Sequence, residues 1–234
     1  MIKILSLAGA LALATLAARE AYAGSIVYDN TNGDKNNFFV NAWPIDSGFA
    51  IANSFTFGSD TKVDGVNFWI WAQDKIPLTS VDWAVVENTG SSGDYPFDDT
   101  VVASGAGINP ASTYVGSTIF QVYKESFATG DVLLSANTTY WLILQNGMTS
   151  DGVQLSVDWD QSDGPSTAYF NVNGTSSPSF SNTIGGCANF AGGGPTCSET
   201  FELLGTSVPE PGTRMLLGPG LLSIAGLLRR RANR

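Results

Sequence analysis

Short runs in which apolar and polar residues alternate, each bounded by Gly, Asn, Asp, Ser or Pro, recur through residues 24–204. Val153–Asp160 alternates without a break, and Val81–Val86 begins in the same way. No stretch of ten residues in this region spaces its apolar side chains as a helix would. Successive side chains of a strand point to opposite faces, so a period of two predicts half-buried β-strands.

The alternating runs predict an all-β fold, a single antiparallel two-sheet sandwich that is jelly-roll-like. Hydrophobic residues make up 43% of the chain, which is enough to build a core. We expect one domain over residues 24–204, because no long linker or internal repeat divides it. The candidate strands are Ile26–Asp29, Ala50–Phe57, Val63–Trp71, Val81–Val86, Thr100–Ser104, Thr118–Lys124, Thr139–Asn146, Val153–Asp160, Thr167–Val172 and Thr200–Leu204.

Residues 1–23 have the layout of a secretory signal peptide. Lys3 supplies the charged start, and Ile4–Ala18 is an almost unbroken apolar stretch. Ala21 and Ala23 give the small-x-small pattern of a cleavage site, with the cut before Gly24. The sequence therefore predicts export from the cytoplasm.

The charge of the exported part excludes one class of function. Residues 24–207 hold four lysines, 19 acidic residues and no arginine, a formal charge of −15. Nucleic-acid binding depends on Lys and Arg that neutralise phosphates, so a nucleic-acid partner is excluded. Histidine is absent from the whole chain, which removes catalytic triads and metal sites that need it.

The two cysteines, Cys187 and Cys197, lie ten residues apart in a Gly-rich segment. An oxidising compartment favours a disulfide between them, which would close a short loop and stabilise the fold by roughly 2–3 kcal/mol. The alternative is two free thiols or half of a metal site. Zinc ligation by two thiolates without histidine is poor, so we predict the disulfide.

The end of the chain combines a motif, an apolar segment and a basic cluster. The motif is Val208, Pro209, Glu210 and Pro211. Met215–Leu228 is apolar or Gly/Pro throughout, and as a helix it would span about 21 Å, less than a bilayer core of about 30 Å. Three arginines follow at once, and positive charge keeps that end of a membrane segment cytoplasmic. They are Arg229, Arg230 and Arg231.

In order, spacing and terminal position this tail, residues 205–234, resembles the PEP-CTERM protein-sorting signal. The resemblance implies a Gram-negative bacterium and processing by an exosortase. It also implies transient insertion in the inner membrane, cleavage near Val208–Pro211, and delivery to the cell surface or extracellular polysaccharide matrix. The folded part is similar to the β-sandwich passengers that precede this signal, which implies no particular activity. The alternative is a permanently tail-anchored envelope protein.

Two tryptophans form a candidate carbohydrate site. Within Val63–Trp71, the residues Val66, Phe68 and Ile70 share one strand face, and Trp69 and Trp71 share the other. A sandwich buries only one face of each sheet, so one set must be covered by a loop or exposed. Exposed tryptophans side by side would stack on sugar rings of a polysaccharide. Packing beneath a loop is the alternative reading.

Acidic residues give a candidate calcium site at Asp158, Asp160 and Asp163. Calcium takes six to eight oxygen ligands, and the spacing here differs from that of an EF-hand. Alternation places Asp158 and Asp160 on an outward face, with Trp159 inward. The alternative is a set of solvated turn acids with no metal or other cofactor.

Hydrolysis by a carboxylate pair is the third chemistry considered. A glycosidase needs two acids about 5–9.5 Å apart across a cleft. Glu87 and Glu125, on or near strands, are the candidates, but nothing in the sequence singles them out. We therefore expect a non-enzymatic protein with a structural or adhesive role, and possible polysaccharide binding as a second property.

Overall fold

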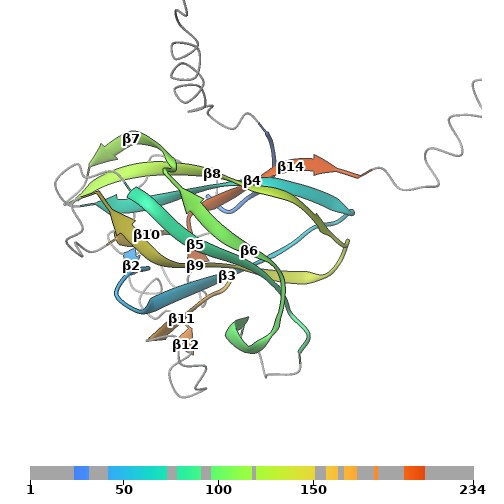
Figure 1. The fold of residues 1–234 in the computed structure, drawn as a ribbon. Helices are drawn as coiled ribbons and strands as arrows, with labels where there is room; N and C mark the ends of the chain where they lie inside the picture. The colour runs from blue at the N-terminus through green and yellow to red at the C-terminus, as the bar shows by residue number, and fades with distance from the viewer. Residues whose placement is uncertain are drawn as a thin grey trace, which may run out of the picture.

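The computed structural model of the chain describes residues 24–31, 42–72, 78–90, 96–117, 120–150, 157–162, 166–172, 182–183 and 198–208. Within them the backbone is almost entirely extended, as the period of two predicted. The single helical element there is the short 3-10 turn η1 (Pro96–Asp98). The strands form two antiparallel sheets packed as a sandwich, which confirms the predicted fold class (Figure 1).

Each sheet collects strands from across the chain. The eight-stranded sheet contains β1 (Ser25–Asp29), β2 (Ala42–Pro44), β4 (Thr61–Ala72), β7 (Ala111–Ser117), β8 (Gln121–Leu134), β10 (Val157–Ser162), β13 (Ser198–Glu199) and β14 (Phe201–Ser207). The six-stranded sheet contains β3 (Phe49–Thr56), β5 (Leu78–Glu87), β6 (Thr100–Ile108), β9 (Thr139–Thr149), β11 (Ala168–Val172) and β12 (Asn182–Thr183). The chain changes sheet from β3 to β4 to β5, and again from β8 through β11, as in a jelly roll.

Strand β4 is the centre of the eight-stranded sheet. One of its edges pairs with β8 along its whole length. The other edge is shared: β14 pairs with its first part and β10 with its last residues. Gly205 lies at the irregular point of the β14 pairing, where a Cβ would fall 2.0 Å from the carbonyl oxygen of Lys62. A glycine is therefore required for the two strands to meet there.

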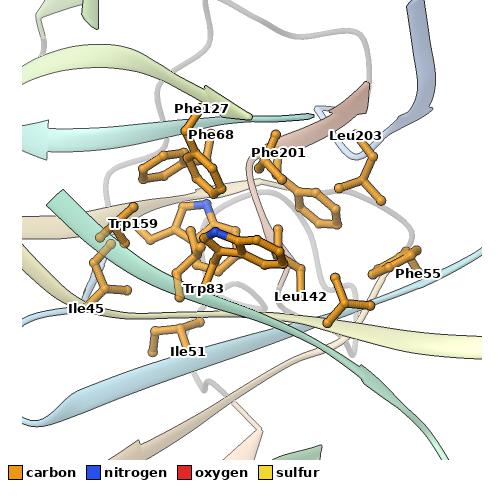
Figure 2. Close-up of a cluster of buried hydrophobic side chains, with 14 of the residues drawn as sticks. Ile45, Ile51, Phe55, Phe68, Trp83, Phe127, Leu142, Trp159, Phe201 and Leu203 are labelled. Carbon is orange, nitrogen blue, oxygen red and sulfur yellow. The ribbon is translucent and has the colours of Figure 1, made fainter. Parts of the chain in front are cut away.

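The core lies between the sheets, and its largest members are aromatic (Figure 2). Val66, Phe68 and Ile70 point into it from β4, as alternation predicted. The ring of Phe68 lies 5.8 Å from that of Phe127 and 6.4 Å from that of Trp159. Each fully buried side chain of this kind contributes about 1.5–3 kcal/mol. The two sheets are joined by rings that meet across the core, such as Trp83 of β5 with Phe127 of β8 at 6.2 Å and Phe55 of β3 with Phe201 of β14 at 6.4 Å.

Most predicted strands are present, with boundaries shifted by a few residues. The short strands β2, β12 and β13 have no predicted counterpart, and two longer elements also differ. Residues 111–117 form β7, which the sequence analysis missed because this edge strand lacks a clear apolar alternation. β8 continues to Leu134, ten residues beyond the predicted end at Lys124. Gly130 has a positive φ within β8, and its pairing with β4 shifts register nearby, so the local pattern is broken where the strand continues.

The two ends of the folded part lie side by side. β1 pairs with β14, and Ser25 is opposite Gly205 in the register. Beyond β14, the N–H of Val208 donates to the carbonyl of Asp60 at 2.7 Å. The first and last strands of the sandwich therefore close one another within the same sheet.

Candidate functional site

The two tryptophans of the candidate carbohydrate site are covered. Trp69 and Trp71 are on the face of β4 that points away from the main core, yet they are only 2% and 6% exposed. They form a second apolar cluster whose other members are Val122, Ala42, Val115 and Phe120. The ring of Phe120 lies 5.2 Å from that of Trp71. The rings are therefore covered, as the alternative reading expected, because Ala42 of β2, Val115 of β7 and Phe120 pack against them.

One cation neutralises an acid on this outer face. The ammonium of Lys124 lies 5.0 Å from the centre of the Trp69 ring and 3.2 Å from Oε2 of Glu202. Asn67 donates its amide N–H to the same oxygen at 2.8 Å, and Ser126 donates to Asn67 at 2.6 Å. Glu202 is fully buried, so this cation and this amide compensate a charge that would otherwise be costly.

Asp160 is the buried partner of the second tryptophan. Nε1 of Trp71 donates to Oδ1 of Asp160, and the hydroxyl of Thr200 donates to Oδ2 at 3.4 Å. Asp160 is 2% exposed. Burial raises its pKa to about 8, and the two hydrogen bonds offset part of this rise. At neutral pH the carboxyl group is therefore largely protonated.

The predicted calcium ligands are not brought together by the described residues. Trp159 points into the core, as predicted, and Asp158 lies opposite Trp71 in the register. Asp160 faces Trp71, and Asp163 lies outside the described residues. In the described ranges no three acidic, cysteine or histidine side chains cluster as a metal would require. Calcium binding at this set remains a prediction.

A second buried acid lies near Asp160. Glu199 is fully buried, and burial raises its pKa well above the ordinary value. The charge of Asp160 raises this pKa further, and the amide of Gln161, opposite Glu199 in the register, lowers it by less. Two acids so close in the interior favour the neutral form of both.

The backbone at Glu199 is held by a cluster of small polar side chains. Asn30 and Asn53 donate their amide N–H groups to the Glu199 carbonyl at 2.6 and 3.1 Å. Ser166 donates to Oδ1 of Asn53 at 2.8 Å and lies 2.6 Å from the hydroxyl of Ser198. All these side chains are buried. No local pattern predicts the cluster, because its members come from four distant segments.

The two acids considered for hydrolysis lie in different sheets. Glu87 ends β5 in the six-stranded sheet, and Glu125 lies on β8 in the other. Glu125 is fully buried, accepts a hydrogen bond from Ser112 at 2.7 Å, and has no partner for Oε2 among the described residues. Burial raises its pKa to about 7, and the Ser112 bond lowers it by less. A group this deep does not reach a substrate in solvent.

Most residues of the sorting and processing predictions lie outside the described residues. The exceptions are Gly24, which precedes β1, and Val208, which follows β14. Outside are Ala21, Ala23, Cys187, Cys197, Pro209, Glu210, Pro211, Arg229, Arg230 and Arg231. Within the described ranges, no helix has the length and apolar character needed to cross a membrane.

No protein-family model matches this chain, and no curated protein is significantly similar to it. On the outer face of the eight-stranded sheet, Trp71 contacts Asp160, and Trp69 lies beside Lys124 and its partner Glu202. That geometry suits a polar second core on the outer face of the eight-stranded sheet, held by paired and protonated carboxyl groups.

Proposed function

We propose that the chain is an exported structural protein of the cell surface or extracellular matrix, released from the membrane at Val208–Pro211. Export begins at the signal peptide, and an exosortase-type enzyme cuts near the motif. The sandwich then remains outside as a non-enzymatic component. The host is a Gram-negative bacterium, as the tail resemblance implies.

The observation that carries this proposal is where the sandwich begins and ends. β1 starts at Ser25, one residue after the expected signal cleavage before Gly24. β14 ends at Ser207, one residue before the motif begins at Val208. Cuts at both places would remove neither strand, and the pairing of β1 with β14 would close the released unit. The two processing points therefore bracket one complete fold.

The placement of the acidic and aromatic residues supports a structural role. The three carboxyl groups with raised pKa values, on Glu125, Asp160 and Glu199, are at most 2% exposed. The two candidate sugar-binding tryptophans are covered as well. These side chains stabilise the sandwich from within, and none of them is presented to a substrate.

The test is the intact mass of the protein recovered from a Gram-negative host that carries an exosortase. We expect a species that starts at Gly24 and ends near Pro209. Glu210→Ala should leave the arginines in place and shift the protein to the membrane fraction. Thr206→Ala, just before the motif and on an exposed residue, is the matched control and should be processed normally.

Retention of Arg229–Arg231 in the unmodified protein would overturn release and favour the permanently tail-anchored alternative. Loss of residues 1–23 alone would support export without sorting. Because the two events leave different masses, one measurement separates them.

A further inference from the structure

One continuous segment forms the open edge of both sheets on the same side of the sandwich. Within the described residues β6 pairs only with β5, and β7, which follows after two residues, pairs only with β8 (Figure 1). Residues 100–123 contain no charged side chain. Four of the seven large apolar side chains that are exposed in the described ranges belong to this segment: Val101, Val102, Ile108 and Tyr114.

Proteins usually protect such edges against pairing with charge, proline or bulges. In β6, a bulge and a proline lie at the two ends of a short stretch that has no such protection. The β5–β6 register shifts between Val85 and Val86, which leaves Val102 without a partner residue, and Pro110 follows the strand. Between them, Ser104, Ala106 and Ile108 are exposed and uncharged.

One hydrogen bond shows which backbone N–H and C=O groups of β6 face the open edge. The N–H of Asn109 donates to the carbonyl of Thr79 on the β5 side at 2.7 Å. In an antiparallel ladder, bonded and non-bonded pairs alternate. From Ile108 back to Ala103 the pairing with β5 is regular, so the N–H and C=O groups of the even-numbered residues face the open edge. Ser104, Ala106 and Ile108 thus each offer one donor and one acceptor.

Ser104, Ala106 and Ile108 are self-complementary about a two-fold axis. If Ala106 lies opposite Ala106 of a second copy, then Ser104 lies opposite Ile108 and Ile108 opposite Ser104. All six free N–H and C=O groups of each copy then find partners on the other copy in antiparallel geometry. The bulge at Val102 and the missing N–H of Pro110 end the pairing on either side. The strand therefore fixes a single register.

The inward row of β6 keeps the strand flat against its own core. Gly107 lies over Phe127, and a Cβ there would fall 2.8 Å from Cγ of that ring. Gly105 lies over Trp83 in the same way, at 3.2 Å. Because Gly105 and Gly107 have no side chains, the larger side chains of this part of β6 lie on the outward face. No inward side chain obstructs a neighbouring strand.

Among the described residues, the uncharged β6 edge is a place where two copies can approach without facing acids. Residues 24–207 carry −15, so two copies repel wherever acids face each other. The nearest acid on the outward face is Asp82, opposite Ala106 in the register. Across two paired β6 strands the two Asp82 residues stand three strand spacings apart, about 14 Å. This exceeds the Debye length of about 8 Å at physiological salt.

From these observations we infer that β6 pairs antiparallel with β6 of a second copy, joining two six-stranded sheets about a two-fold axis through Ala106. The dimer is weak at low salt, because the net charge opposes it, and tightens as salt screens that charge. It supplies a self-assembly contact for the protein in the matrix. It does not depend on how the C-terminal tail is processed.

Cysteine cross-linking tests the register in the full chain, kept in a mild non-ionic detergent because of its apolar termini. Opposed residues of a hydrogen-bonded pair lie about 5.5 Å apart at Cα, within the range a disulfide needs. Ala106→Cys should therefore give a covalent dimer under mild oxidation. Thr113→Cys, equally exposed on the uncharged edge strand β7, is the matched control and should stay monomeric.

Sedimentation velocity of the same full chain tests the association without a cross-link. The N–H of Ala106 makes no bond to β5, so Ala106→Pro removes only bonds to the second copy, and an edge strand tolerates it. We expect this variant to raise the dimer dissociation constant at least about tenfold with the thermal transition nearly unchanged. Equal cross-linking at 106 and 113, cross-linking at neither, or a monomer at every salt concentration would overturn the inference.

Discussion

The two faces of β4 are about equally buried, yet they are stabilised in different ways. On the inner face Phe68 packs against the rings of Phe127 and Trp159 in the core between the sheets. On the outer face Trp69 and Trp71 pack in a small cluster and contact charged or titratable groups. Burial alone therefore does not reveal what a residue contributes. The inner face depends on packing, and the outer face depends on packing together with the protonation and pairing of its acids.

The largest expected effect comes from removing one aromatic side chain from each face. Phe68→Ala should destabilise the protein by about 4 kcal/mol, because it leaves a cavity among rings that cannot collapse. Trp69→Ala should cost about 3 kcal/mol, the lower end of the range for such a change, since the outer cluster is small. Chemical denaturation of the two variants measures the difference. Equal losses would show that the outer cluster is as well packed as the core.

The next largest effect is a pH dependence of stability that arises from Asp160 on the outer face. The pKa of Asp160 rises from 3.8 to about 8 on folding, so between these values the folded protein holds a proton that the unfolded chain has lost. This contribution is fully present below about pH 4 and is lost as the pH rises through 8. We expect a loss on the order of 3 kcal/mol between pH 5 and pH 8, because each pKa unit corresponds to about 1.4 kcal/mol.

Asp160→Asn keeps an acceptor for Trp71 and removes the titration. Its stability should fall much less between pH 5 and pH 8 than that of the unmodified protein, with the remaining slope due to Glu125 and Glu199. Asp131→Asn, at an exposed carboxylate, is the control and should retain the full slope. A slope that Asp160→Asn leaves unchanged would contradict the assignment.

The smallest expected effect is the difference in stability loss between Trp71→Phe and Trp69→Phe on the outer face. Trp71→Phe removes the donor to Asp160 and should cost about 1–3 kcal/mol. Nε1 of Trp69 has no partner among the described residues, so Trp69→Phe should change stability by less than about 1 kcal/mol. Thermal unfolding at pH 6 compares them. A larger loss for Trp69→Phe would show that its indole N–H is bonded after all.

Several features of the site could not be predicted from the sequence. Alternation correctly placed Trp159 inward and Asp160 outward, but it could not show that the outward face is covered. The cover comes from Ala42, Val115 and Phe120, which are far from β10 in the chain. The cluster of Asn30, Asn53 and Ser166 around Glu199 is likewise non-local. No local pattern distinguishes these polar residues from turn residues.

The sequence by itself determined most of the strands, because the faces of an extended chain follow directly from a period of two. It also predicts the two cleavage points, before Gly24 and near Pro209. The tertiary structure alone decided which faces are covered, which acids lose contact with water, and which strand is left at an edge. These outcomes depend on segments that meet only on folding. Burial raises the pKa of Asp160, and the order of the strands leaves hydrogen-bonding groups of β6 open.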